Sequence, residues 1–228
     1  MKTHPTLKMT FFLIFLLLMF NQCTPQNKSS NQVLPAASAV QGKPVGGHCD
    51  GCQLMYIDMP TYISSTDTSD GWFEGGKKLI IKGTAYALNG KSPVPGVIVY
   101  YYHTDTKGNY SPGNGISNEA KRHGHLRGWV KTDSNGQYSI FTSRPASYPN
   151  SDIEAHIHIF VKEPDIANEY YIDEWIFDDD PLLTPAKRKL PEKRGGSGIM
   201  KVVQSGDVQM VKQDIILGLN IPDYPERK

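Results

Sequence analysis

The chain has 228 residues, with 24 Lys and Arg against 23 Asp and Glu, so its formal net charge is only +1. This length supports one domain with a sizeable core or two small domains. Because the charge is balanced and the basic residues are scattered, we expect no nucleic-acid partner. The 21 Gly and 16 Pro residues suit a turn-rich β protein.

The N-terminus has the pattern of a targeting segment. Lys2 and Lys8 precede an apolar run at 11–20, which is short for a bilayer-spanning helix and typical of a signal-peptide core. Cys23 follows at once, which resembles a bacterial lipoprotein signal, although the usual small residues before the cysteine are missing. We predict a signal peptide at 1–22, a lipid anchor at Cys23 as the only membrane attachment, and an exported, cell-envelope protein. Cleavage nearby, with Cys23 incidental, is the alternative.

Two further segments precede the predicted domain. Residues 23–44 are polar and lack periodicity, which predicts a flexible tether. Residues 45–78 form an N-terminal extension that contains Cys49 and Cys52. Thiols outside the cytosol tend to pair, so we expect a disulfide between them. A thioredoxin-like role lacks its βαβ context, and a metal site with His48 lacks a full ligand set.

Short strand-like segments follow at close intervals from residue 79 onward. Turn sequences separate them, among them Asn89-Gly90 and the run from Asp133 to Gly136. One excursion at 184–193, bracketed by Pro185 and Pro191, could be helix or loop. This pattern predicts an all-β sandwich over residues 79–228. The expected strands are 79–88, 97–103, 126–131, 137–142, 156–162, 170–177, 200–204 and 208–217.

The strand at 156–162 begins with His156-Ile157-His158. Residues two apart on a strand point to the same face, so both imidazoles would lie side by side. Each neutral imidazole can donate a nitrogen lone pair to a metal. Two more ligands are needed, and Tyr110 and Tyr148 are candidates. A lone His-x-His or a lone tyrosine is more often a packing feature, so only the set of four carries weight.

These residues occur in an order that resembles the intradiol ring-cleavage dioxygenases. After an apolar strand come D-x-x-G-x-Y ending at Tyr110, R-G-x-x-x-T-D-x-x-G-x-Y starting at Arg127, then Tyr148-Pro149, and then His156-Ile157-His158. The resemblance is good over residues 79–161. It implies a β-sandwich of the intradiol dioxygenase type with a short irregular N-terminal extension. It also implies a non-haem ferric ion, Fe(3+), held by Tyr110, Tyr148, His156 and His158.

The same resemblance implies an activity and its partners. The substrate would be a small aromatic diol of the catechol type, and O2 would be the second substrate. The ring would open between the two hydroxyl-bearing carbons. By analogy, Tyr110 would leave the iron and act as a base. Tyrosinate is a hard anionic donor that suits a ferric ion, whereas zinc or copper on the same residues fits the donor set less well.

Arg127 is our candidate to hold an anionic or phenolic group of the substrate, because a guanidinium can bind such oxygens through two hydrogen bonds. His123 and His125 form a rival histidine pair in a loop that should lie near Tyr110. Many catabolic members of the family carry an arginine just before the histidine pair. Residues 152–155 lack one here, and Arg127 or Arg144 could supply that charge.

The missing arginine leaves a second hypothesis open. The chain could be a non-catalytic β-sandwich lipoprotein of the envelope that binds a phenolic ligand, a glycan or a protein partner. The intact set of four candidate ligands favours the enzyme, because a scaffold alone has no need of it. The helical N-terminal domain of catechol and hydroxyquinol dioxygenases is not expected, since nothing before residue 79 has the required periodicity.

Overall fold

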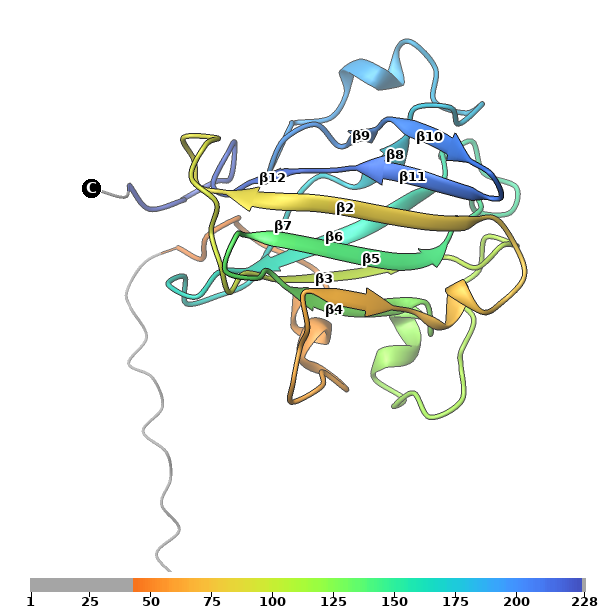
Figure 1. Cartoon of the computed structure of the whole chain (residues 1–228), viewed down its shortest axis with the longest axis horizontal. Coiled ribbons are helices and arrows are strands. Elements are labelled where there is room, and N and C mark those ends of the chain that lie inside the picture. The colour runs from red at the N-terminus through yellow and green to blue at the C-terminus, as the bar shows by residue number, and fades with distance from the viewer. Residues whose placement is uncertain (1–42, 227–228) are drawn as a thin grey trace, which may run out of the picture. The chain divides into compact units, whose positions relative to one another are not determined.

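The computed structural model describes residues 43–226. The predicted signal peptide, the anchor at Cys23 and residues 23–42 of the predicted tether lie outside this range. Within residues 43–226, no helix is long and apolar enough to cross a bilayer. Two β-sheets pack face to face in this part of the chain, which confirms the predicted sandwich (Figure 1).

The first sheet has the strand order β1-β5-β2-β11-β10, and β12 extends the pairing of β2. Strand β2 pairs antiparallel with β5 and parallel with β11, so the first sheet is mixed. The bounds of its strands are β1 Thr66–Thr68, β2 Lys78–Tyr86, β5 Gln137–Ser143, β10 Val202–Ser205, β11 Val208–Lys212 and β12 Ile215–Ile216.

The second sheet has the order β4-β3-β6-β8-β9, and β7 also pairs with β6. Its centre is antiparallel, with β3 between β4 and β6. Its strands are β3 Ile98–His103, β4 Arg127–Lys131, β6 His156–Lys162, β7 Tyr170–Tyr171, β8 Trp175–Phe177 and β9 Ile199–Met200. The part of the chain that the structure describes also contains four short 3-10 helices: η1 Cys52–Tyr56, η2 Asp70–Trp72, η3 Ala120–His123 and η4 Lys187–Lys189.

The core between the sheets is built by alternation along the strands. Ile157, Ile159 and Val161 of β6 point inward and are almost completely buried. A second, smaller apolar cluster lies on the opposite face of the same sheet, where Tyr100 and Phe160 are covered by Cys52 and Met55 from η1. The N-terminal extension therefore covers the outer face of the second sheet, next to the histidine pair.

The structure differs from the sequence-based prediction at four places. The predicted strand 200–204 is divided between β9 in the second sheet and β10 in the first. Strand β1 lies within the extension and pairs with β5, so residues 66–68 belong to the sandwich sheet although their polarity had suggested irregular chain. The predicted strand 208–217 is interrupted because the Asp214 carboxylate, instead of a ladder carbonyl, accepts the Thr84 N–H. The predicted strand 170–177 is likewise two short strands, β7 and β8. The excursion at 184–193 contains η4.

Candidate metal centre

The two histidines of β6 lie on the outer face of the second sheet. Ile157, the residue between them, points into the core, so the period of two places His156 and His158 together on the other side. Their ring centroids are 4.7 Å apart. Tyr102 of β3 is paired with His158 and stacks on its ring at 4.5 Å. The alternation predicted from the sequence is the feature that brings both rings to one surface.

Tyr110 is presented by a tight turn directly after β3. The Asp105 carboxylate accepts backbone N–H groups of Lys107 and Asn109 and the hydroxyl of Ser111, which closes the turn around Gly108. Gly108 has φ +80°, and a Cβ there would lie 2.0 Å from the Ser147 carbonyl oxygen. The glycine of the D-x-x-G-x-Y motif therefore allows this turn to pack directly against the residue that precedes Tyr148.

Tyr148 lies in the loop between β5 and β6, and this loop is bound to the Tyr110 turn. The Thr104 hydroxyl donates to the Ala146 carbonyl at 2.6 Å, and the Ala146 N–H donates to the Asp105 carbonyl at 3.1 Å. On the other side, Gly124 packs so closely that a Cβ there would lie 3.1 Å from the Tyr110 Cα. These contacts position the two tyrosines relative to each other.

The four predicted ligand residues converge on one point. The Tyr110 Oη lies 2.5 Å from the Tyr148 Oη and 2.9 Å from the His158 Nε2. The Tyr148 Oη lies 3.0 Å from the His156 Nε2 and 3.4 Å from the His158 Nε2. Side chains from two loops and one strand thus bring two oxygens and two nitrogens into mutual contact. We call these four residues the Tyr/His cluster.

Hydrogen bonds on the far side of each ring fix which nitrogen carries the proton. The His156 Nδ1 lies 2.7 Å from the Glu154 carbonyl oxygen, which can only accept, so Nδ1 carries the hydrogen. The His158 Nδ1 lies 3.1 Å from the Tyr171 Oη. The Glu174 carboxylate, which can only accept, also lies 3.9 Å from the His158 Nδ1, so this nitrogen carries the hydrogen. Both Nε2 atoms then present lone pairs to the cluster.

The donor set fits a bound cation. Four contacts inside the cluster would have to share the two phenol protons, since neither Nε2 carries one. Ligand atoms about 2 Å from a common ion lie about 2.9–3.4 Å apart at ordinary coordination angles. Three of the four contacts, at 2.9, 3.0 and 3.4 Å, match this spacing. Among the described residues, no group of three or more His, Cys, Asp and Glu side chains could hold a metal. A metal ion at the Tyr/His cluster would therefore need the two tyrosines as ligands.

The protein environment favours the neutral forms of Tyr110, Tyr148 and His158. Burial and the hydrogen bond to Tyr148 raise the pKa of the Tyr110 phenol. Burial also raises the pKa of the Tyr148 phenol, although the hydrogen bond from Tyr110 opposes this. Burial, together with the neighbouring His156, lowers the pKa of the His158 ring well below its ordinary value. A neutral imidazole is the form that binds metals.

Arg127 is not brought to the cluster. Its buried guanidinium donates to the Ile57 carbonyl at 2.7 Å and to the Asp58 carboxylate at 3.1 Å, and it lies over the Trp129 ring. These partners belong to the end of η1 and the loop after it, so Arg127 anchors the N-terminal extension. The position of Arg127 does not support the substrate-binding role that the sequence suggested.

The rival histidine pair and Arg144 also have other partners. His123 is buried, bonds the Tyr100 hydroxyl at 2.8 Å and stacks on Tyr102 at 3.7 Å. His125 bonds the Glu74 carboxylate at 2.7 Å. Arg144 forms an ion pair with Asp179 at 2.7 Å, so it does not face the cluster either.

Two residues near the cluster were not singled out from the sequence. Tyr171 orients His158 through its hydroxyl. Lys187 of η4 lies 3.0 Å from the carboxylate of Glu154, an acid in the segment 152–155 that lacks the arginine of other family members. Each contact joins distant parts of the chain, and no local motif marks either residue.

A cavity of about 290 Å³ opens beside the cluster, and we call it the His158 cavity. Tyr102, Phe160 and Tyr171 supply an aromatic wall next to His158. His48, Asp50 and Arg194 supply polar groups from other parts of the chain. Ligand pockets in proteins span about 300–1,000 Å³, so this cavity has the size of a site for a small ligand.

Comparison with known proteins agrees with this geometry. Residues 57–190 match a protein-family model described as Dioxygenase. A catechol 1,2-dioxygenase from Acinetobacter lwoffii is 28% identical over 173 residues, which cover 63% of this chain and 55% of that protein. The matched stretch thus spans about half the length of this relative. The chain belongs to the intradiol ring-cleavage dioxygenase family.

Solved structures show the same fold. Catechol 1,2-dioxygenase from Pseudomonas arvilla C-1 superposes with a TM-score of 0.53 at 20% identity, covering 82% of this chain and 65% of that one. The dioxygenase domain of a dioxygenase–carbohydrate-binding protein fusion from Streptomyces sp. SirexAA-E superposes with a TM-score of 0.50 at 23% identity. The match covers 70% of this chain and 89% of that domain. The β-sandwich of this chain is therefore the sandwich of these dioxygenases.

Proposed function

We propose that this protein is a non-haem iron(III) dioxygenase that cleaves catechol-type rings between the two hydroxylated carbons. The observation that carries the proposal is the convergence of two phenol oxygens and two imidazole nitrogens, which make four contacts of 2.5–3.4 Å among themselves. The relatives named as catechol 1,2-dioxygenases support the substrate class. Both atoms of O2 would enter the product, so catechol and O2 would give cis,cis-muconic acid with no other reactant.

Tyr110, Tyr148, His156 and His158 would hold the ferric ion. When bound, the ion supplies a Lewis acid that makes an ionised diol ring reactive toward O2. His156 and His158 would bind through Nε2, because their Nδ1 atoms donate to Glu154 and Tyr171. The Tyr110 Oη would accept the proton of one diol hydroxyl. Tyr102, Phe160 and Tyr171 would exclude water from the face of the ring.

Iron loading and oxygen uptake test this proposal. Tyrosinate on ferric iron absorbs visible light, so the full-length protein should turn red when one equivalent of ferric ion is added. Catechol should then shift the band, and an oxygen electrode should record one O2 consumed per catechol. Tyr148→Phe or His156→Ala should lose the band. Tyr138→Phe is a matched control, because Tyr138 is a buried core residue that bonds Gln213.

Two outcomes separate the hypotheses. A protein that stays colourless and iron-free would contradict the enzyme proposal. A protein that binds ferric ion and catechol but consumes no oxygen would support the ligand-binding sandwich instead.

We also propose that the protein is exported and anchored at the cell envelope through Cys23. The support is the sequence pattern of residues 1–23 alone: two lysines, an apolar run and a cysteine. Mass spectrometry of the mature N-terminus tests it, since a lipid-modified Cys23 should be the first residue. A mature chain that begins elsewhere, with an unmodified Cys23, would contradict the anchor.

A further inference from the structure

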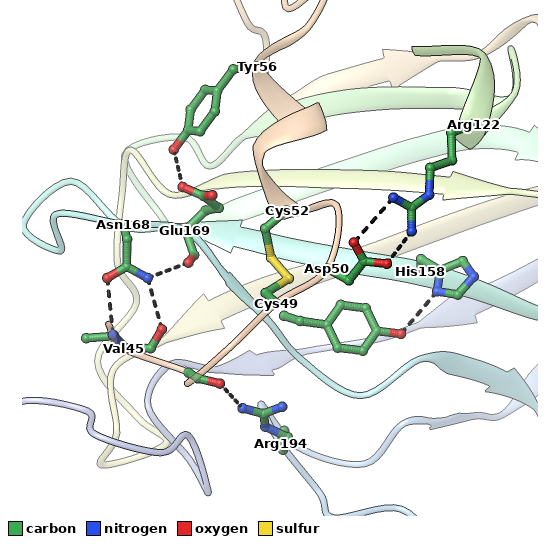
Figure 2. Close-up of a disulfide and its surroundings, with 12 residues drawn as sticks. Val45, Cys49, Asp50, Cys52, Tyr56, Arg122, His158, Asn168, Glu169 and Arg194 are labelled. Carbon is green, nitrogen blue, oxygen red and sulfur yellow. Dashed lines mark hydrogen bonds and ion pairs between the residues drawn. A yellow bond between two sulfur atoms is a disulfide. The ribbon is translucent and has the colours of Figure 1, made fainter. Parts of the chain in front are cut away.

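The His158 cavity has a wall that comes from the N-terminal extension. His48, Cys49 and Asp50 line it together with His158 of the Tyr/His cluster. Cys49 and Cys52 are joined by a disulfide that closes residues 49–52 into a covalent ring. We call this ring, together with the preceding His48, the disulfide loop (residues 48–52). Figure 2 shows Asp50 and His158 to the same side of the disulfide. A segment far from β6 in sequence thus reaches the space beside a candidate metal ligand.

The chain before the disulfide loop is hydrogen-bonded to residues from the C-terminal half of the sequence. The Asn168 side chain accepts the Val45 N–H at 3.1 Å and donates to the Val45 carbonyl at 2.9 Å. Arg194, which itself lines the cavity, donates to the Gly46 carbonyl at 2.7 Å (Figure 2). Backbone groups on the N-terminal side of the loop are therefore bound to residues more than 120 positions away.

The chain after the disulfide loop is fixed as firmly. Cys52 and Met55 of η1 are buried against Tyr100 and Phe160 on the outer face of the second sheet. The Trp129 indole donates to the Met55 carbonyl at 2.7 Å. With both flanks bound and the disulfide between them, the loop is a fixed wall of the cavity and not a freely moving flap.

We propose that the disulfide loop determines which aromatic diols the site accepts, by limiting the space beyond His158 to single rings with small substituents. The inference rests on the proposed diol-binding function and adds to it a residue-level cause of specificity. The cavity holds about 290 Å³, just below the usual range of ligand pockets, so a bulky substituent directed toward the loop would press against His48, Cys49 and Asp50. Asp50 forms an ion pair with Arg122, and its side chain is 73% exposed, so its truncation opens the rim of the cavity and removes only a surface ion pair.

Binding of two diols to the ferric-loaded full-length chain tests the proposal. Catechol and 4-tert-butylcatechol are titrated under argon by their effect on the visible band, so that neither is cleaved and a Kd is obtained for each. The wild type should bind catechol at least about tenfold more tightly, the scale on which a misfit alkyl group is rejected. Both Asp50→Ala and Cys49→Ser/Cys52→Ser should narrow this ratio by about fivefold or more. Substitution is preferred to a thiol reductant, because thiols reduce ferric iron.

Tyr56→Phe is the matched control for a loosened extension. Tyr56 belongs to η1 and bonds Glu169 at 2.8 Å, but it does not line the cavity, so the wild-type ratio should persist. A ratio within twofold of wild type in both loop variants, or a wild type that binds both diols equally, would overturn the proposal while leaving the dioxygenase intact. A wild type with no ferric band would overturn the proposed function itself, and this inference with it.

Discussion

The chain contains the motif D-x-x-G-x-Y twice, and the two copies have different roles. Asp105 and Asp133 each accept backbone N–H groups two and four residues later. Gly108 and Gly136 each have positive φ and each pack against a backbone oxygen. The turns are thus alike, yet Tyr110 joins the Tyr/His cluster while Tyr138 is buried in the core. The motif specifies a turn and the direction of a tyrosine, and the surrounding sheet face decides what that tyrosine does.

The largest expected effect is the loss of activity when Tyr110, the tyrosine of the first turn, is replaced. Tyr110→Phe removes the oxygen that lies within 2.9 Å of both Tyr148 and His158. We expect its kcat for catechol to fall by at least about a thousandfold, which corresponds to about 4 kcal/mol in the barrier. The free energy of unfolding should change little. Steady-state oxygen uptake measures kcat, and urea unfolding measures the free energy of unfolding. A near-normal kcat for Tyr110→Phe would show that Tyr110 is not part of the active site.

The reverse is expected for the second tyrosine. The Tyr138 hydroxyl donates to the Gln213 carbonyl at 2.5 Å inside the core, so Tyr138→Phe leaves that carbonyl without its partner. We expect a loss of about 1–3 kcal/mol in the free energy of unfolding. The ferric band and kcat should stay within twofold of wild type. Urea unfolding combined with the visible spectrum checks this, and a bleached band would mean that the two turns are functionally coupled.

The glycines allow a finer comparison. Ala at position 108 would adopt φ +80° with its Cβ 2.0 Å from the Ser147 oxygen, whereas Ala at position 136 would meet the Ala85 oxygen at 2.9 Å. Both changes should cost about 1–3 kcal/mol of stability. Only Gly108→Ala should also weaken the ferric band, because its clash moves the Tyr110 turn away from Tyr148. Iron titration of both variants measures this, and equal loss of iron binding in the two would contradict it.

The smallest effect concerns the turn carboxylates. Asp105→Asn and Asp133→Asn keep an oxygen that can accept the backbone N–H groups. Each change should therefore alter the free energy of unfolding by less than about 1 kcal/mol. Asp105 also accepts the Ser111 hydroxyl, so its variant should be the less stable of the two. Urea unfolding of both variants measures their free energies of unfolding. A larger loss of stability for Asp133→Asn would show that the two turns are less alike than their hydrogen bonds suggest.

Local patterns predicted most of the sandwich and the four residues of the cluster. The period of two in β6 placed His156 and His158 on one face, and the turn motif placed Tyr110 directly after β3. These features need only neighbouring residues, so they can be read from the sequence. The convergence of the tyrosines was expected from the order of motifs in a family, since spacing alone does not bring loops together.

The features that sequence reasoning missed all depend on long-range contacts. Strand β1 is polar and short, and only its pairing with β5 makes it a strand. Asn168 binds Val45 across 123 positions, which positions the extension beside the cavity. Arg127 was predicted to hold the substrate because a guanidinium can bind oxygens through two hydrogen bonds, yet its guanidinium is occupied by Ile57 and Asp58. No periodicity in the sequence predicts such long-range partners.

An iron anomalous difference map from crystals of the ferric-loaded protein would decide whether the Tyr/His cluster is a metal site. We predict a single strong peak within bonding distance of the Tyr110 and Tyr148 oxygens and the Nε2 atoms of His156 and His158. A peak bound elsewhere on the chain, or no peak between these four atoms at full iron loading, would contradict the assignment.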